Sequence, residues 1–240
     1  MTLELDLHGF PKTSGIFETI KTVHGKPIAL GRHMRRALQS ARELGIRMEG
    51  EEALRQKIAR CISENPQKIG RLRVCIFNEG SLVTHHAYEE IDSPARLTFY
   101  SQTVTGMQHK LFPYDFRFSI LEIARNEGFD DCILFNSKNE ITESAVSNLM
   151  FLIAGEWVTA PITAGLLPGV MRAIAIEECG VKVRPIHISE VPNIESGFLI
   201  SSLRIAQAIS HIGEMKVKIG EQSAEMLANI RAHAQPASVG

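Results

Sequence analysis

Residues 130–148 read DDCILFNSKNEITESAVSN and join a strand pattern to a group of polar residues. The DDCILFN part is a nearly continuous apolar run, which is typical of a strand covered on both faces. The polar part brings Glu143 and Asn148 to the start of the next apolar run, SNLMFLI. Helical patterns flank both runs, so the sequence predicts a mixed α/β fold with polar side chains at strand ends.

The chain is expected to form two halves on either side of an irregular segment, residues 104–109. Residues 1–103 are predicted to form a smaller N-terminal α/β domain, with a hairpin around the turn HGK and a helix over HMRRALQSARELG. Residues 110–240 are predicted to form a larger C-terminal domain that opens with a helix over KLFPYDFRFSILEIARNEG, with Pro113 in its first turn. The last residues, QPASVG, are expected to fray.

Composition excludes several classes of protein. The 240 residues are 44% hydrophobic and 22% charged, which rules out a disordered chain. With 26 basic against 27 acidic residues, the chain has no electrostatic footprint for nucleic acid or an anionic membrane. No apolar run approaches the roughly 18 residues of a membrane span, and the start MTLELDL lacks a signal-peptide pattern. With four widely spaced cysteines, these features predict a cytoplasmic protein with reduced thiols.

Most familiar chemical motifs are absent. The sequence has no Rossmann glycine fingerprint, HExxH, GxSxG or EF-hand loop, so hydride transfer, zinc proteolysis and hydrolase chemistry have no motif support. His85 and His86 are adjacent, and on a strand they would point to opposite faces. Surface histidines are therefore favoured there, and no metal site is predicted.

Six strings remain, and they follow one another in a fixed order. They are FETI, HMRRALQSA, a lysine (Lys110) twenty residues before DD, TES-x-x-SN, LPGVMR and SSLR. With them the sequence resembles, from Gly15 to Gly213, the fold-type IV (class IV) pyridoxal-phosphate enzymes: branched-chain aminotransferases, D-amino acid aminotransferases and aminodeoxychorismate lyases. The resemblance implies a class IV aminotransferase-like fold of two α/β domains with pyridoxal 5'-phosphate between them, and a homodimer.

The resemblance also implies roles around the reacting end of the cofactor. Lys110 matches the catalytic lysine, which binds the cofactor aldehyde and moves protons on the substrate. Glu143 matches the carboxylate that stabilises the protonated ring nitrogen, and Asn148 belongs to the same cofactor-binding pattern. Tyr114 matches an aromatic that contacts the phenolic oxygen in many relatives. The plainer alternatives are a surface lysine, a solvated turn carboxylate and an aromatic of the core.

The cofactor's phosphate needs donors and positive charge. Arg36 matches the family's phosphate arginine, and the amides of Val170 and Met171 open the helix after LPG, where the helix dipole favours an anion. Ser202 would add a hydroxyl. Arg36 could instead lie on a solvated helix face, and Ser202 could be an ordinary loop residue.

The reaction is harder to predict than the cofactor. The SSLR string is similar to one found in aminodeoxychorismate lyases, and its Arg204 could pair with a substrate carboxylate. Arg73 is a second substrate-binding candidate, although either arginine could make structural ion pairs only. We expect a 4-amino-4-deoxychorismate lyase of folate synthesis. The alternatives are a branched-chain or D-amino acid aminotransferase and a family member without catalysis. Pro113 and Met171 replace residues common in relatives, which predicts weaker cofactor binding.

Overall fold

The computed structural model describes residues 3–78 and 80–239; the expected domain limits at residues 1 and 240 lie outside them. The chain divides into two compact units, which we describe separately. Unit 1 comprises Met1–Glu90, His109–Tyr114 and Gln235–Gly240, and unit 2 comprises Ile91–Gln108 and Asp115–Ala234. The chain therefore passes between the units four times, whereas the sequence pattern predicts one passage at residues 104–109.

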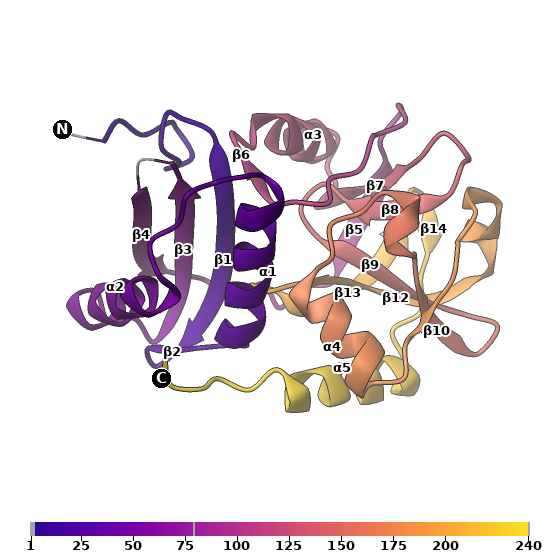
Figure 1. Cartoon of the computed structure of the whole chain (residues 1–240). Coiled ribbons are helices and arrows are strands. Elements are labelled where there is room, and N and C mark those ends of the chain that lie inside the picture. Colours follow the sequence, from indigo (N-terminus) through magenta and orange to yellow (C-terminus); the bar gives the residue numbers. More distant parts are fainter. Residues whose placement is uncertain (1–2, 79, 240) are drawn as a thin grey trace. The chain divides into compact units, whose positions relative to one another are not determined.

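Unit 1 is built on an antiparallel sheet of β1 (Gly15–Val23), β2 (Lys26–Pro27), β3 (Ile69–Phe77) and β4 (Gly80–Ala87). The strand order is β2-β1-β3-β4 (Figure 1). Both turn residues between β1 and β2 have positive φ, 48° at His24 and 76° at Gly25, as a type I′ hairpin requires. The predicted hairpin is confirmed.

Two helices pack on this sheet, α1 (Leu30–Glu43) and α2 (Glu51–Glu64). They share one apolar core with alternate residues of β1 and β3: Ile16, Ile20, Leu30, Met34, Ala37, Ala41, Leu54, Ile58, Ile62, Leu72, Val74 and Ile76. Because side chains alternate along a strand, Glu18 lies on the same face as Ile16 and Ile20, and Phe17 lies on the opposite face. The sheet therefore presents an acid to α1.

The predicted surface location is wrong for one of the adjacent histidines. His85 is buried in β4, where its Nε2 lies 2.7 Å from the Thr22 hydroxyl and its Nδ1 2.8 Å from the Asn65 carbonyl oxygen. His86 is exposed, as alternation along the strand requires.

The expected helix start at Lys110 is also wrong. Lys110 precedes a short strand, β6 (Leu111–Phe112), which pairs with β1, and Pro113 lies before the helix α3 (Asp115–Asn126). The buried Phe112 ring stacks on Phe10 at 5.6 Å between centroids. Gly15 makes room for this ring, because a Cβ there would lie 2.7 Å from it. Aromatic packing and strand pairing thus override the local helical pattern.

The tail does not fray over its described part. Pro236 bridges to Ile28, and the Ala237 N–H donates to the Pro27 carbonyl at 3.1 Å. Arg55 donates to the Val239 carbonyl oxygen at 2.9 Å. Backbone pairing holds this segment on unit 1.

Unit 2 is built on a larger mixed sheet of order β11-β10-β9-β12-β13-β5-β7-β8, with β14 beside β13. The pairs β13–β5 and β5–β7 are parallel, while β7–β8, β9–β12 and β12–β13 are antiparallel. The strands are β5 (Ala95–Phe99), β7 (Asp131–Phe135), β8 (Ile141–Ser144), β9 (Asn148–Ile153), β10 (Glu156–Thr159), β11 (Lys182–Val183), β12 (Ile194–Ser201), β13 (Ile205–Ile212) and β14 (Met215–Lys216).

The helices of unit 2 are α3, α4 (Val170–Glu178) and α5 (Glu221–His233), with 3-10 turns η1 (Ile162–Ala164) and η2 (Ile188–Asn193). The predicted strand over DDCILFN is confirmed as β7, in which residues 131–134 are fully buried. Across residues 3–78 and 80–239, no helix is both long and apolar enough to span a bilayer. The strand and helix ends of this unit carry most of the candidate site residues.

Candidate active site

Lys110 lies beside two aromatic rings of unit 1. Its Nζ is 4.5 Å from the ring centroid of Phe17 and 5.0 Å from that of Tyr114. The Lys110 carbonyl oxygen accepts a hydrogen bond from the Phe17 N–H at 2.8 Å, so the backbone is fixed to the start of β1. Lys110 is half-buried and Tyr114 is buried. The geometry places the amine beside two aromatic rings, whose π-faces attract a cation.

Arg36 belongs to a buried cluster of charged residues with Glu18 and His33. Its Nε and Nη2 donate to the two carboxylate oxygens of Glu18 at 2.8 and 2.6 Å, and His33 Nδ1 lies 2.6 Å from Glu18 Oε2. Burial alone would raise the pKa of Glu18, but Arg36 and His33 outweigh burial and lower this pKa from 4.5 to about 2. The paired carboxylate therefore fixes Arg36 in one orientation.

Arg73 shares the Phe17 face of the sheet. Its guanidinium carbon lies 4.2 Å above the Phe10 ring and 5.9 Å from the Phe17 centroid, and Nη1 donates to the His8 carbonyl oxygen at 2.6 Å. Burial lowers the pKa of this arginine. Lys110 and Arg73, predicted from separate strings, are thus both neighbours of one ring, Phe17.

Glu143, at the end of β8, is held by three donors of unit 2. Arg117 Nη2 donates to Oε1 at 2.6 Å, and the Leu167 N–H and Asn148 Nδ2 donate to Oε2 at 3.1 and 3.4 Å. Glu143 and Arg117 are both buried. A guanidinium at this distance stabilises the ionised carboxylate, which is the form that can stabilise a protonated ring nitrogen.

The start of α4 is shaped by a close approach to Asn148. A Cβ on Gly169 would lie 1.9 Å from Asn148 Oδ1, so only glycine fits at this position. Gly169 is the N-cap of α4, and no side chain of the described residues caps the helix there. The first-turn amides, which belong to the buried residues Val170 and Met171, are therefore suited to an anion such as phosphate.

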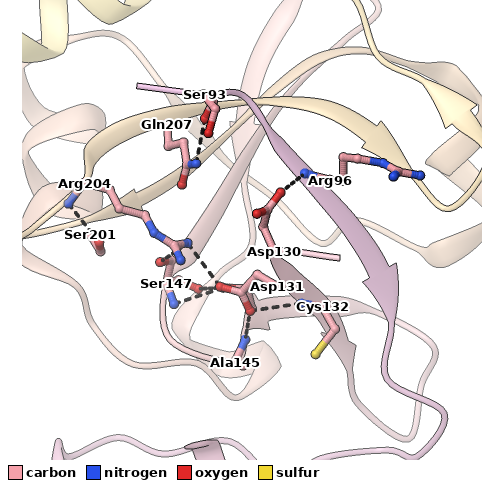
Figure 2. Close-up of polar contacts among 11 residues, drawn as sticks. Ser93, Arg96, Asp130, Asp131, Cys132, Ala145, Ser147, Ser201, Arg204 and Gln207 are labelled. Atoms are coloured by element: carbon pink, nitrogen blue, oxygen red, sulfur yellow. Dashed lines mark hydrogen bonds and ion pairs between the residues drawn. The ribbon is translucent and has the colours of Figure 1, made fainter. Parts of the chain in front are cut away.

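Arg204 and Ser202 lie in the turn between β12 and β13. Arg204 Nη1 donates to Asp131 Oδ2 at 3.1 Å and to the Ser147 hydroxyl at 3.2 Å (Figure 2). Ser202 is half-buried. Burial raises the pKa of the Asp131 carboxyl, and Arg204 acts against this rise. The substrate contact predicted for Arg204 therefore has to share this guanidinium with two protein groups.

The candidate residues are divided between the units, four in unit 1 (Arg36, Arg73, Lys110, Tyr114) and six in unit 2 (Glu143, Asn148, Val170, Met171, Ser202, Arg204). Within them, the structure brings Lys110 to Tyr114 and Glu143 to Asn148. Sequence reasoning missed Glu18, His33 and Arg117. A signal existed for Arg117, because it falls on the buried stripe of α3 with Ile120, Leu121 and Ala124.

Comparison with known proteins places these observations in a family. The family model described as amino-transferase class IV matches residues 15–212. A Schizosaccharomyces pombe protein provisionally named aminodeoxychorismate lyase is 23% identical over 193 residues, which is 77% of this chain and 82% of that protein.

Solved structures share the fold at low identity. A Legionella pneumophila protein provisionally named 4-amino-4-deoxychorismate lyase has a TM-score of 0.85 at 21% identity, covering 92% of this chain and 91% of that one. A hypothetical aminotransferase from Mycobacterium tuberculosis in its PLP-bound form has a TM-score of 0.81 at 15% identity, covering 92% and 88%.

Proposed function

Because the chain belongs to the class IV aminotransferase family, as its sequence motifs predict, we propose that it is a 4-amino-4-deoxychorismate lyase. Family membership confirms the predicted fold and an enzyme that depends on pyridoxal phosphate, either a lyase or an aminotransferase. The observation that carries the choice of lyase is that the S. pombe relative and the Legionella structure both bear that name. The SSLR string at residues 201–204 supports the same choice.

The donor set of the chain fits the cofactor. Glu143 is a buried carboxylate fixed by Arg117, so it can accept a hydrogen bond from a protonated ring nitrogen. The first turn of α4 offers amides to the phosphate, and Arg36, held in one orientation by Glu18, is the guanidinium that the family resemblance gives to the phosphate. When bound, pyridoxal phosphate supplies an electron sink for the carbanion that forms at the substrate's reacting carbon.

The chain's own residues hold and move the protons. Lys110 would hold the cofactor through Nζ until the substrate's amine takes its place, and the freed Nζ, beside Phe17 and Tyr114, would then take a proton from the substrate. Lys110 later returns a proton as 4-aminobenzoate and pyruvate are released. These two products contain every atom of the substrate, so the lyase needs no second substrate. An aminotransferase needs a keto acid to complete its cycle.

This difference gives the test. Purified protein with pyridoxal phosphate is incubated with 4-amino-4-deoxychorismate and no keto acid, and pyruvate and 4-aminobenzoate are measured. The lyase releases both in equal amounts, and Lys110→Ala lowers the rate by at least roughly a hundredfold. Lys138→Ala, at an exposed position, is the matched control and keeps the wild-type rate.

Two other outcomes would overturn the proposal that the chain is a lyase. Product that forms only with branched-chain or D-amino acids and 2-oxoglutarate identifies an aminotransferase, a reading that the aminotransferase fold of the M. tuberculosis protein supports. No reaction in either assay identifies a family member without catalysis.

The location and assembly of the protein are part of the same proposal. The enzyme acts in the cytoplasm, a location that four free cysteines support. It works as a homodimer on a small amino substrate, as the family resemblance implies. Light scattering on a sizing column tests the assembly by the mass of the eluting species.

A further inference from the structure

A buried ion pair in unit 2 joins three segments that are far apart in the sequence. Asp131 is fully buried at the start of β7, and its Oδ2 accepts hydrogen bonds from Arg204 Nη1 at 3.1 Å and from the Ser144 hydroxyl at 3.0 Å. Its Oδ1 receives the N–H groups of Cys132 and Ala145 at 2.9 and 3.0 Å. Figure 2 shows Arg204 reaching Asp131 from the β12–β13 turn, with Ala145 and Ser147 approaching from the β8–β9 turn. We call these contacts the Asp131 hub.

On one side, the hub holds the turn that carries Ser202. Arg204 also bonds within this turn, where its N–H donates to the Ser201 hydroxyl at 3.4 Å. The next residue, Ile205, is buried and has a φ of 60°, a conformation that β-branched residues rarely adopt. Such a conformation persists only where the surroundings impose it, and the Arg204 anchor is one such constraint.

On the other side, the hub holds the turn between Glu143 and Asn148. Ser144, Ala145 and Ser147 each bond to a hub residue. The Ser144 N–H donates to the Ser147 carbonyl oxygen at 2.7 Å, and the Ser147 N–H donates to the Ser144 hydroxyl oxygen at 3.0 Å, which closes the turn on itself. Glu143 and Asn148 flank this turn and bond to each other across it at 3.4 Å.

We propose that Asp131 and Arg204 are positioning residues, which set the distance between the Glu143 carboxylate and the Ser202 turn so that one cofactor can engage both. This inference rests on the proposed function, in which Glu143 serves the ring nitrogen, and on the phosphate contact that the family resemblance implies for Ser202. The buried contact between Arg204 and Asp131 favours this role over a direct contact with a substrate carboxylate, because Asp131 already offsets the positive charge that would attract such a carboxylate.

The test compares two forms of the cofactor that differ only in the phosphate. Pyridoxal phosphate and pyridoxal are titrated into the full-length apo protein, and dissociation constants are measured by absorbance. Loss of the hub separates the ring and phosphate contacts, which pyridoxal phosphate needs together and pyridoxal does not. We expect Asp131→Asn and Arg204→Met each to raise the dissociation constant of pyridoxal phosphate roughly tenfold and that of pyridoxal much less. The double variant should raise this dissociation constant no more than either single variant does, because both substitutions remove the same interaction.

Controls separate positioning from general destabilisation. Asp130→Asn makes the same change one position away, at an exposed residue that accepts a hydrogen bond from the Arg96 N–H. This variant should leave the dissociation constants of pyridoxal phosphate and pyridoxal unchanged. The thermal midpoint of each apo variant is measured in parallel. If Asp131→Asn does not fold, Arg204→Lys and Ser147→Ala keep the test open, because each weakens the hub while leaving the buried charges balanced. Both variants should show a smaller rise in the dissociation constant of pyridoxal phosphate, again with little change for pyridoxal.

Three results would overturn the inference. Equal weakening of both cofactor forms would mean that the pair is merely structural. No change in either form would mean that the turn needs no anchor. A substrate KM that rises in Arg204→Met but not in Asp131→Asn, with cofactor binding intact, would assign Arg204 to the substrate. A wild-type protein that binds no pyridoxal phosphate would instead refute the proposed function, and the two failures are thus distinguishable.

Discussion

Unit 1 and unit 2 each bury a carboxylate beside an arginine, yet the two carboxylates respond to burial in opposite directions. Glu18 is 3% exposed and its pKa is lowered to about 2, whereas Asp131 is 0% exposed and its pKa is raised. Burial penalises the charged form in both, so the difference comes from the partners. Glu18 receives two guanidinium nitrogens and an imidazole; Asp131 receives one guanidinium nitrogen at 3.1 Å.

The comparison shows that a buried ion pair is not one kind of interaction. Paired, short hydrogen bonds from Arg36 offset the loss of water around Glu18. The single contact from Arg204 and the neutral donors together offset it only in part around Asp131, so the pKa of this carboxyl stays raised. The first arrangement suits a group that must stay charged to hold Arg36, and the second suits a hub that connects backbone segments.

The largest expected effect comes from breaking the stronger pair. Glu18→Gln leaves the largely buried Arg36 without a counter-charge, and should lower the free energy of unfolding at pH 7 by about 3–5 kcal/mol. Urea denaturation measures it. The control Glu64→Gln, at an exposed position of unit 1, should change this free energy by less than about 0.5 kcal/mol. A loss below about 1 kcal/mol in Glu18→Gln would contradict the strong pairing.

The pH dependence of stability should follow the same residue. A carboxyl whose folded pKa lies below its usual value contributes stability above pH 4.5 and loses it as the pH falls towards 2. For Glu18 this amounts to about 3 kcal/mol. Burial lowers the pKa of His33, whose contribution is likewise lost as the pH falls below 6.5. Denaturation curves from pH 7 to pH 2 should therefore show a decline in stability, and Glu18→Gln should flatten the part of this decline below pH 4.5.

Asp131 should act with the opposite sign in the same experiment. Because its pKa is raised, its contribution is present below pH 3.8 and declines as the pH rises. The acid decline should therefore survive in Asp131→Asn. If the acid decline in stability flattened in Asp131→Asn and not in Glu18→Gln, the two carboxyls would have exchanged the behaviour described here.

Breaking the weaker pair should cost less stability than breaking the stronger one. Asp131→Asn keeps an acceptor for the Cys132 and Ala145 N–H groups but weakens the contact with Arg204. We expect a loss of about 1–3 kcal/mol at pH 7 by urea denaturation. A loss as large as that of Glu18→Gln would mean that the number of guanidinium contacts does not decide the strength of these pairs.

The smallest effect is expected at a partly exposed pair. Arg184 Nη2 lies 2.9 Å from Glu190 Oε2 with side chains 36% and 29% exposed, and the hydrogen bond from Arg184 lowers the pKa of Glu190. Solvent screening makes such pairs weak. Arg184→Ala should therefore cost less than about 1 kcal/mol by the same measurement. A larger loss would show that burial is not what separates strong pairs from weak ones in this chain.

The sequence predicts what depends on local pattern and on motif order. The hairpin at Gly25, the strand over residues 131–135 and the family itself follow from turn residues, apolar runs and strings in sequence. The strand at Phe112 did not follow, because it depends on rings contributed by distant residues. The pairing of Glu18 with Arg36 was also missed, because strings read separately do not reveal a contact between them.

The placement of candidate residues beside one another was predictable only in part. Glu143 and Asn148 share one string, and the structure joins them. Arg117 is read from sequence as one more helical arginine until Glu143 is known to face it. The roles given to Lys110, Arg36 and Ser202 stay predictions that the cofactor titrations test.

The interleaving of the units has a consequence for biosynthesis. Residues 235–239 pair with Pro27 and Arg55 of unit 1, yet they leave the ribosome after every residue of unit 2. Nascent chains tend to fold N-terminal regions first. Here the hairpin and helices of the first ninety residues leave the ribosome before residues 235–239, which pair beside β2. The contacts that complete unit 1 can therefore form only late in translation, although most of unit 1 is synthesised first.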